Sequence, residues 1–273
     1  MKRGLEVFSP VQVGAYRLSI AGLALLPVVI RHWNPTLKSK LRYFLIVGLI
    51  GNGIPAFLFS TAQTRLNSST AGALNALTPL FTLVLGVFLF STKLTTNKVI
   101  GVLVGLAGAL ILILLKANGL AEPYWAYGLL IVLATLMYGT SVNTVGRYLN
   151  NIRPTITAAV PLVLVAGPSL ILLFSTDFVQ RMYQPGAWTA LGYISILGLI
   201  GSAASLVAFN KLIQMTSPIF ASTTTYLMPI VALFWGLLDG EAMGWPQILG
   251  MLSILVGIWL VNRKRNVVSP KTI

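Results

Sequence analysis

The chain of 273 residues contains no cysteine, one histidine and five acidic residues. The lack of cysteine excludes disulfides and thiolate chemistry. The only histidine, His32, follows Arg31 in a predicted loop, so no histidine lies in an apolar segment for acid–base or metal chemistry. No GxxxxGK[ST] sequence occurs, which excludes ATP binding through a P-loop. We therefore expect no cofactor, no metal site and no catalytic residues.

Charged residues are also scarce, at 9% of the chain, while hydrophobic residues make up 56%. A soluble domain has about 25% charged residues. An apolar segment of about 20 residues crosses the hydrocarbon core of a membrane. The sequence thus predicts an all-α polytopic membrane bundle with nine transmembrane helices, at 11–30, 43–62, 70–90, 99–115, 125–146, 155–174, 187–209, 218–238 and 246–262.

The net charge of +14 is distributed unequally between the two sides of this bundle. Alternating loops place 13 Lys and Arg residues on one side and five on the other, with Arg17 inside a span and all five acids on the Lys/Arg-poor side. The positive-inside rule then predicts that the tail, 266–273, faces the cytoplasm. Because the basic residues are spread over short loops, we expect the lipid bilayer as a partner and no nucleic acid.

The chain contains an internal repeat. The tetrapeptide GLIG occurs at 48–51 and again at 198–201, an offset of 150. The repeat is also marked by the following pairs: Pro79 with Pro229 and Gly86 with Gly236 at the same offset, and Arg3, Leu5 and Pro10 with Arg147, Leu149 and Pro154 at an offset of 144. We therefore predict one repeat at 1–116 and a second at 123–265.

The two repeats are expected to be inverted in the membrane. Five helices in each copy is an odd number, so the second copy enters upside down, as in many secondary transporters. An apolar stretch, 125–146, precedes Arg147, whereas Met1 stands at the end of the equivalent stretch. We expect the first helix of a ten-helix plan to be missing from 1–116 and to be encoded upstream. The alternative is a duplication that only enlarged the bundle.

Polar residues near the middle of the predicted spans are candidates for substrate binding, because polar groups in hydrocarbon usually face a cavity or another helix. The expected substrate-binding set in one midplane cavity is Asn52, Asn75, Tyr138, Ser202, Thr225 and Tyr226. The repeat pairs Asn52 with Ser202 and Asn75 with Thr225. Helix-breaking Pro79 and Pro229 leave the carbonyl four residues earlier without its helical hydrogen bond. The alternative is that these side chains only hold helices together.

Two further features have two interpretations each. Arg17 lies six or seven residues inside its helix, where it either extends to the membrane surface or pairs with a substrate carboxylate. Gly101 and Gly105 form a GxxxG pattern, and Gly250 and Gly257 lie in the equivalent helix. Close helix packing is the first interpretation of these glycines, and a homodimer contact is the second.

Three segments resemble the EamA-type drug/metabolite transporters: SPVQVGAYRLSIAGLALLP at 9–27, STAGALNALTPLFTLVLGVFLF at 69–90 and TYLMPIVALFWGLLDGE at 225–241. The resemblance implies two five-helix units and amino acids or related metabolites as substrates. The chain departs from the family pattern in its first helix and where Ser91, Thr92 and Lys93 stand opposite Gly240 and Glu241.

These features predict a secondary transporter of small organic metabolites in the cytoplasmic (inner) membrane, working by alternating access, with export as the expected direction. An intramembrane enzyme acting on lipid-linked precursors is disfavoured because no histidine, cysteine or central acid is available. A membrane assembly subunit would explain the duplication but not the central polar residues.

Overall fold

The computed structural model describes residues 2–66, 68–92, 95–116, 125–228, 230–231 and 245–262, and all regular secondary structure within them is helical. The helices are α1 (Lys2–Leu5), α2 (Pro10–His32), α3 (Pro35–Ser39), α4 (Leu41–Gly48), η1 (Leu49–Gly53), α5 (Ile54–Ala62), α6 (Ser68–Asn75), α7 (Thr78–Phe90), α8 (Thr96–Lys116), α9 (Trp125–Tyr148), α10 (Pro154–Phe174), α11 (Phe178–Arg181), α12 (Ala187–Gly198), η2 (Leu199–Ala204), α13 (Ser205–Met215), α14 (Pro218–Ser222), η3 (Thr223–Tyr226) and α16 (Trp245–Asn262).

Several helices are long enough to cross a membrane. Five are both long and apolar enough: Pro10–His32, Leu41–Ala62, Ala126–Tyr148, Pro154–Phe174 and Ala187–Met215. Shorter apolar helices run over Thr78–Phe90, Thr96–Gly108 and Ile248–Val261. The all-helical class is thus confirmed for the described residues. The count of nine spans stays a prediction, because residues 229 and 232–238 of the span at 218–238 and the tail at 266–273 lie outside those residues.

Short polar segments fix where helices begin. At the start of α2 the Ser9 hydroxyl accepts a hydrogen bond from the Gln12 N–H at 3.3 Å, and the Gln12 side chain accepts one from the Ser9 N–H at 2.9 Å. This reciprocal pair is a capping box, followed by a proline at the first helical position. Asn34 and Ser217 cap α3 and α14 by accepting one hydrogen bond each, from the Leu37 N–H and the Phe220 N–H, and each is also followed by a proline.

The predicted span at 70–90 is interrupted instead of continuous. Helix α6 ends at Asn75 and α7 begins at Thr78, with Pro79 in the first turn of the second piece. Proline is favoured there because its missing N–H has no helical partner at that position. The chain therefore contains a helix break at the depth where the sequence placed one of its candidate residues.

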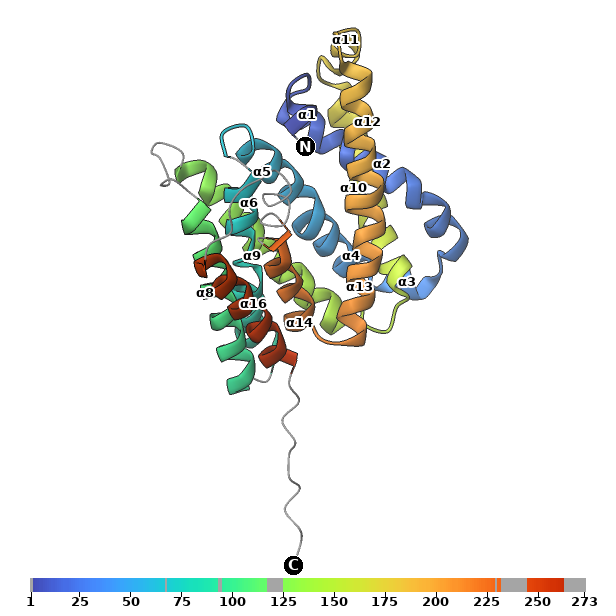
Figure 1. Ribbon diagram of the computed structural model, residues 1–273. Helices are drawn as coiled ribbons and strands as arrows, with labels where there is room; N and C mark the ends of the chain where they lie inside the picture. Colours follow the sequence, from blue (N-terminus) through green and yellow to red (C-terminus); the bar gives the residue numbers. More distant parts are fainter. Residues whose placement is uncertain are drawn as a thin grey trace, which may run out of the picture.

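Figure 1 shows two groups of helices, one containing α2, α10, α12 and α13, the other containing α5, α6, α8, α9, α14 and α16. In the first group α2 and α10 are antiparallel, because Gln12 near the start of α2 contacts Thr176 just after the end of α10. The two helices approach closely at Gly22, where an added Cβ would lie 2.7 Å from the Leu162 carbonyl oxygen. Leu18, Leu162 and Val165 form the buried core of this contact.

In the second group, α8 and α16 are packed through their glycines. A Cβ on Gly101 would lie 2.7 Å from the Gly257 carbonyl oxygen, and one on Gly108 would lie 2.7 Å from the Gly250 carbonyl oxygen. The start of one helix thus meets the end of the other, so this pair is also antiparallel. These glycines therefore serve helix packing, because the glycine-bearing faces of α8 and α16 cover each other within the chain.

Gly257→Ala should separate α8 from α16, because its Cβ would lie 2.5 Å from the Gly105 nitrogen and 2.6 Å from the Gly101 oxygen. Overpacking of this kind costs about 1–3 kcal/mol. The control is Gly167→Ala in α10, where an added Cβ meets nothing within 4 Å; alanine is favoured over glycine in a helix by about 1 kcal/mol. Thermal unfolding in detergent should show a lower Tm for Gly257→Ala and an unchanged or higher Tm for Gly167→Ala. Equal values would contradict the packing.

Candidate functional site

The two GLIG segments adopt the same unusual backbone. Each lies at the junction with a π-helical stretch, η1 in the first copy and η2 in the second. The Asn52 side-chain amide donates to the Val47 carbonyl at 2.9 Å, and the Ser202 hydroxyl donates to the Leu197 carbonyl at 3.4 Å. In both cases the acceptor is five residues earlier. π-helical turns often occur at functional sites, and here a polar side chain completes each one.

The glycine at the start of each GLIG segment permits a close contact with another helix. A Cβ on Gly48 would lie 2.9 Å from the Pro161 carbonyl oxygen in α10. A Cβ on Gly198 would lie 3.0 Å from the Arg17 carbonyl oxygen in α2. The two contacts are equivalent under the sequence repeat, since Arg17 and Pro161 differ by the offset of 144 and the glycines by 150.

Asn75 lies at the break between α6 and α7 and is buried. Its amide nitrogen lies 3.2 Å from the Met228 sulfur, which connects the break to the segment after η3. Its backbone carbonyl accepts a hydrogen bond from the Thr78 hydroxyl at 2.8 Å. The carbonyl that Pro79 was expected to leave without a partner therefore has one inside the protein.

The equivalent residues in the second copy bond to backbone carbonyls. The Thr225 hydroxyl donates to the Ser222 carbonyl at 2.9 Å. Tyr226 is fully buried, its hydroxyl donates to the Val102 carbonyl of α8 at 2.9 Å, and its ring lies against Gly105. These contacts attach η3 to α8. Pro229 lies outside the described residues.

Arg17 and Tyr138 are a second pair of candidate residues. Tyr138 in α9 stacks on Phe59 of α5 at 5.9 Å between ring centroids. The Arg17 guanidinium of α2 lies within electrostatic range of the Tyr138 hydroxyl. The Arg17 Nε is buried and has no hydrogen-bond partner. Among the candidates, a described contact joins Asn75 to the segment next to Tyr226, whereas Arg17 and Tyr138 are related by electrostatic range alone.

Two buried asparagines were missed by the sequence reasoning. The Asn143 amide of α9 donates to the Thr82 carbonyl of α7 at 2.8 Å and to the Gly139 carbonyl at 2.9 Å. Asn210 of α13 is 1% exposed and its amide nitrogen has no partner. Asn143 lies near the end of the predicted span at 125–146 and Asn210 just after the span at 187–209, whereas only mid-span residues had been considered. A search for asparagine at any depth would have found them.

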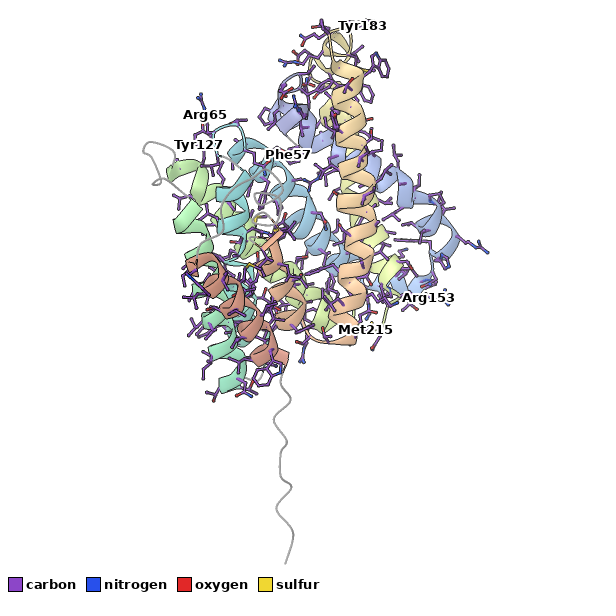
Figure 2. All side chains as sticks on the ribbon, in the orientation of Figure 1. Phe57, Arg65, Tyr127, Arg153, Tyr183 and Met215 are labelled. Atoms are coloured by element: carbon purple, nitrogen blue, oxygen red, sulfur yellow. The ribbon has the colours of Figure 1, made fainter. Side chains whose placement is uncertain are left out.

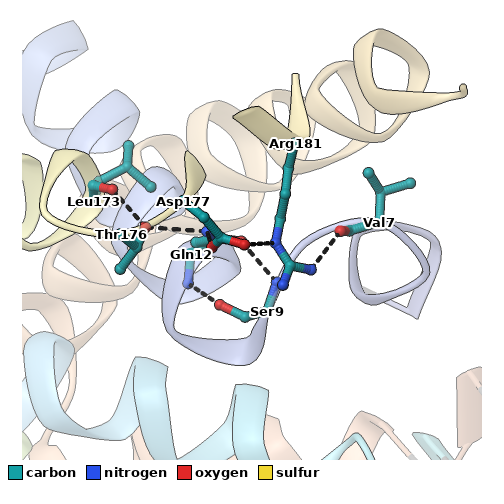
Figure 3. Close-up of polar contacts among 7 residues, drawn as sticks. All are labelled: Val7, Ser9, Gln12, Leu173, Thr176, Asp177 and Arg181. Carbon is teal, nitrogen blue, oxygen red and sulfur yellow. Dashed lines mark hydrogen bonds and ion pairs between the residues drawn. The ribbon is translucent and has the colours of Figure 1, made fainter. Parts of the chain in front are cut away.

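A polar cluster that the sequence reasoning also missed closes one end of the α2–α10 pair (Figure 3). The buried Gln12 amide donates to the Thr176 hydroxyl at 3.0 Å and to the Asp177 carboxylate at 2.7 Å. Arg181 forms an ion pair with Asp177 at 2.7 Å and donates to the Val7 carbonyl at 3.0 Å. The capping sequence at Ser9 was the available signal, since it orients Gln12.

The opposite end of the same helix pair is hollow. A cleft of about 530 Å³ lies between the end of α2 and the start of α10, lined by Arg31, His32, Trp33, Asn34, Thr36, Leu37, Asn151, Ile152, Arg153 and Ile156. Its charged side chains are basic. Figure 2 places Arg153 and Met215 toward this end and Tyr183 at the other, in agreement with the assignment of loops to two sides.

Comparison with known proteins identifies the family. Residues 1–114 and 125–263 match the model of the EamA-like transporter family. The chain belongs to this family. This EamA-family protein is 28% identical over 274 residues to the uncharacterized inner membrane transporter YedA of Escherichia coli, covering 95% of the chain and 83% of the relative. An uncharacterized transporter of Archaeoglobus fulgidus is 22% identical over 269 residues, covering 97% and 93%.

A third relative has a named substrate, and a solved structure shares the fold. The S-adenosylmethionine/S-adenosylhomocysteine transporter of Chlamydia trachomatis is 26% identical over 255 residues, covering 88% of this chain and 77% of the relative. One crystal structure, 18% identical, superposes with a TM-score of 0.69 and covers 94% of this chain and 88% of its own. The protein is thus a membrane transporter with the fold of that structure.

The Asp177 carboxylate gives a pH test of the polar cluster. Its hydrogen bond and ion pair with Arg181 lower its pKa below the ordinary value of 3.8. A lowered folded pKa contributes stability above the unfolded pKa, and this contribution is lost as pH falls through the folded pKa. We expect the Tm of the wild-type protein to fall more steeply below pH 4 than that of Asp177→Asn, because the variant lacks this titration. Parallel Tm curves from pH 7 to 3 would contradict the contact.

Proposed function

We propose that this EamA-family transporter moves small organic metabolites across the cytoplasmic (inner) membrane by alternating access between two inverted repeats. Export is the proposed direction. The observation that carries the proposal is the matched pair of π-helical GLIG segments, each packed on the equivalent helix of the other copy. Amino acids and related compounds are the proposed substrate class, and the named substrates of the relative from Chlamydia trachomatis belong to it.

Reciprocal contacts support the inverted arrangement. Under an offset of 149, Gly101 is equivalent to Gly250 and Gly108 to Gly257. Gly101 contacts Gly257 and Gly108 contacts Gly250, so each contact is the repeat-related copy of the other. A two-fold axis in the membrane plane produces such reciprocal contacts between antiparallel helices. The proposed units are 1–116 and 123–265.

The π-helical segments suggest where the two repeats change conformation. A π-helical turn carries one residue more than an α-helical turn, and its hydrogen bonds are less regular. In each copy a polar side chain, Asn52 or Ser202, takes the carbonyl that the irregular turn leaves available. Exchange of this bond for one to a substrate would couple binding to a change in helix packing. We therefore keep Asn52 and Ser202, with Asn75, Thr225 and Tyr138, as proposed substrate contacts.

The test of this proposal compares the metabolites in the medium of cells that overproduce the protein with those in the medium of deletion cells. We expect at least one small organic metabolite to accumulate outside the overproducing cells, and its export to continue when ATP is depleted while the ion gradients are clamped. Unchanged extracellular metabolites across both strains would contradict the proposal.

Asn75→Ala separates substrate binding from helix packing. If Asn75 contacts substrate, export should show a KM increased roughly 2- to 12-fold, the loss expected for a neutral hydrogen bond of about 0.5–1.5 kcal/mol. The matched variant is Tyr226→Phe, which removes the hydroxyl bonded to Val102 and should lower Tm with KM unchanged. A lowered Tm with unchanged KM for Asn75→Ala as well would leave Asn75 a packing residue only.

The proposed topology places the tail in the cytoplasm. It rests on the excess of Lys and Arg in the loops assigned to that side. A reporter fused after Ile273 should be active when it requires the cytoplasm and inactive when it requires export. Activity of the export-dependent reporter would overturn the orientation of every loop.

A further inference from the structure

Arg17 is a partly buried cation whose Nε is fully buried, and no counter-ion is found for it among the described residues. Its Nε has no hydrogen-bond partner, and the structure gives the guanidinium no ion pair. The two acids within the described residues, Glu6 and Asp177, pair with Arg3 and Arg181. The other three acids, Glu122, Asp239 and Glu241, belong by sequence to loops or span ends on the Lys/Arg-poor side.

The side chain lies inside the helix bundle. Arg17 is seven residues after Pro10, which begins α2, so its Cα lies about 10 Å along the helix. One turn earlier on this helix, Gly14 faces the Phe57 ring and the Ser60 hydroxyl of α5. The guanidinium reaches the electrostatic range of Tyr138, in the middle of α9. An arginine extended to the membrane surface would approach the helix ends instead.

An unpaired guanidinium in this position is unfavourable. Arginine stays protonated under all ordinary conditions, so burial cannot discharge it. Arginine at the centre of a spanning helix costs at least about 2.5–3.5 kcal/mol on insertion scales. Buried cations are retained in proteins when they pair with an anion or serve a site. Among the described residues no anion pairs with Arg17, and an anionic group of a bound molecule would supply the matching charge.

We infer that Arg17 binds the anionic group, a carboxylate or a phosphate, of the transported solute, with Tyr138 beside it as a second donor. This inference deepens the proposed function and rests on it. The planar guanidinium donates two parallel hydrogen bonds to a carboxylate or phosphate, a stronger and more selective contact than a neutral hydrogen bond. Tyr138 is held by its stacking on Phe59. Arg17 comes from the first repeat and Tyr138 from the second.

The first experiment measures the sign of a stability change without ligand. Arg17→Gln removes a buried unpaired charge and should raise the Tm of the purified protein in a neutral detergent. If Arg17 instead stabilised the fold through its own contacts, the same variant would lower Tm, and that result would overturn the inference. Arg65→Gln is the control, because Arg65 is an exposed basic residue on the Lys/Arg-poor side and should leave Tm unchanged.

The second experiment measures which solutes stabilise the protein. The probes are the twenty amino acids against the corresponding amino acid amides, and glycerol 3-phosphate against glycerol, so that the members of each pair differ only in the anionic group. We expect every stabilising solute to be the anionic member of its pair. Arg17→Gln should weaken the apparent affinity of the protein for that anionic solute about 10-fold or more, as expected for the loss of a charge-assisted hydrogen bond. Arg17→Lys should retain part of the response, and Arg65→Gln all of it.

A lipid phosphate is the other source of the same chemistry, so the solute titrations are repeated in phosphatidylcholine vesicles with and without phosphatidylglycerol. Equal solute responses support the inference. Stabilisation by phosphatidylglycerol that depends on Arg17, or stabilisation by no anion in the panel, overturns it. Export of a neutral or cationic solute that survives Arg17→Gln would also overturn it while leaving the proposed function intact. Absence of any export by the wild-type protein would instead contradict the proposed function.

Discussion

The fold depends on the requirement that polar groups in hydrocarbon find partners inside the protein. The chain meets it mainly with short side chains that bond to nearby carbonyls. Asn52 and Ser202 do so at the π-helical turns, and Thr78 does so at the break before α7. These bonds supply partners for carbonyls where the helical backbone is irregular. Arg17 is the clearest departure from the same requirement, which is why it points to a bound molecule.

Close approach of helices is the second determinant. Glycines bring backbones together at Gly101, Gly108 and Gly257, and at the two GLIG segments against α2 and α10. Helix association in lipid lacks the hydrophobic effect and relies on such van der Waals contact. The same contacts recur in both copies, so the packing of one repeat on the other is described by a small set of equivalent positions.

Much of the helix pattern could be predicted from sequence, because the apolar segments are long and the caps carry recognisable residues. The positions of α2, α9 and α10 follow the predicted spans closely. The break between α6 and α7 was less predictable, since Pro79 marks a missing hydrogen bond but does not show whether a helix bends or ends there.

The candidate site could be predicted from the sequence only in part, for a similar reason. Depth along a helix can be read from residue numbers, but the direction of a side chain cannot, and Tyr226 points to α8, where its hydroxyl bonds to the Val102 carbonyl.

The two ends of the α2–α10 pair are unlike, with the Gln12–Asp177–Arg181 cluster at one and the cleft beside Arg153 at the other. If the two repeats exchange conformations, the bonds of this cluster break in one orientation, and the described residues at the opposite end offer no equivalent ion pair to replace them. The two orientations of the empty carrier then differ in free energy, and their equilibrium constant departs from one. Such a carrier has a preferred resting orientation, and without substrate it leaves the disfavoured orientation faster than it leaves the preferred one.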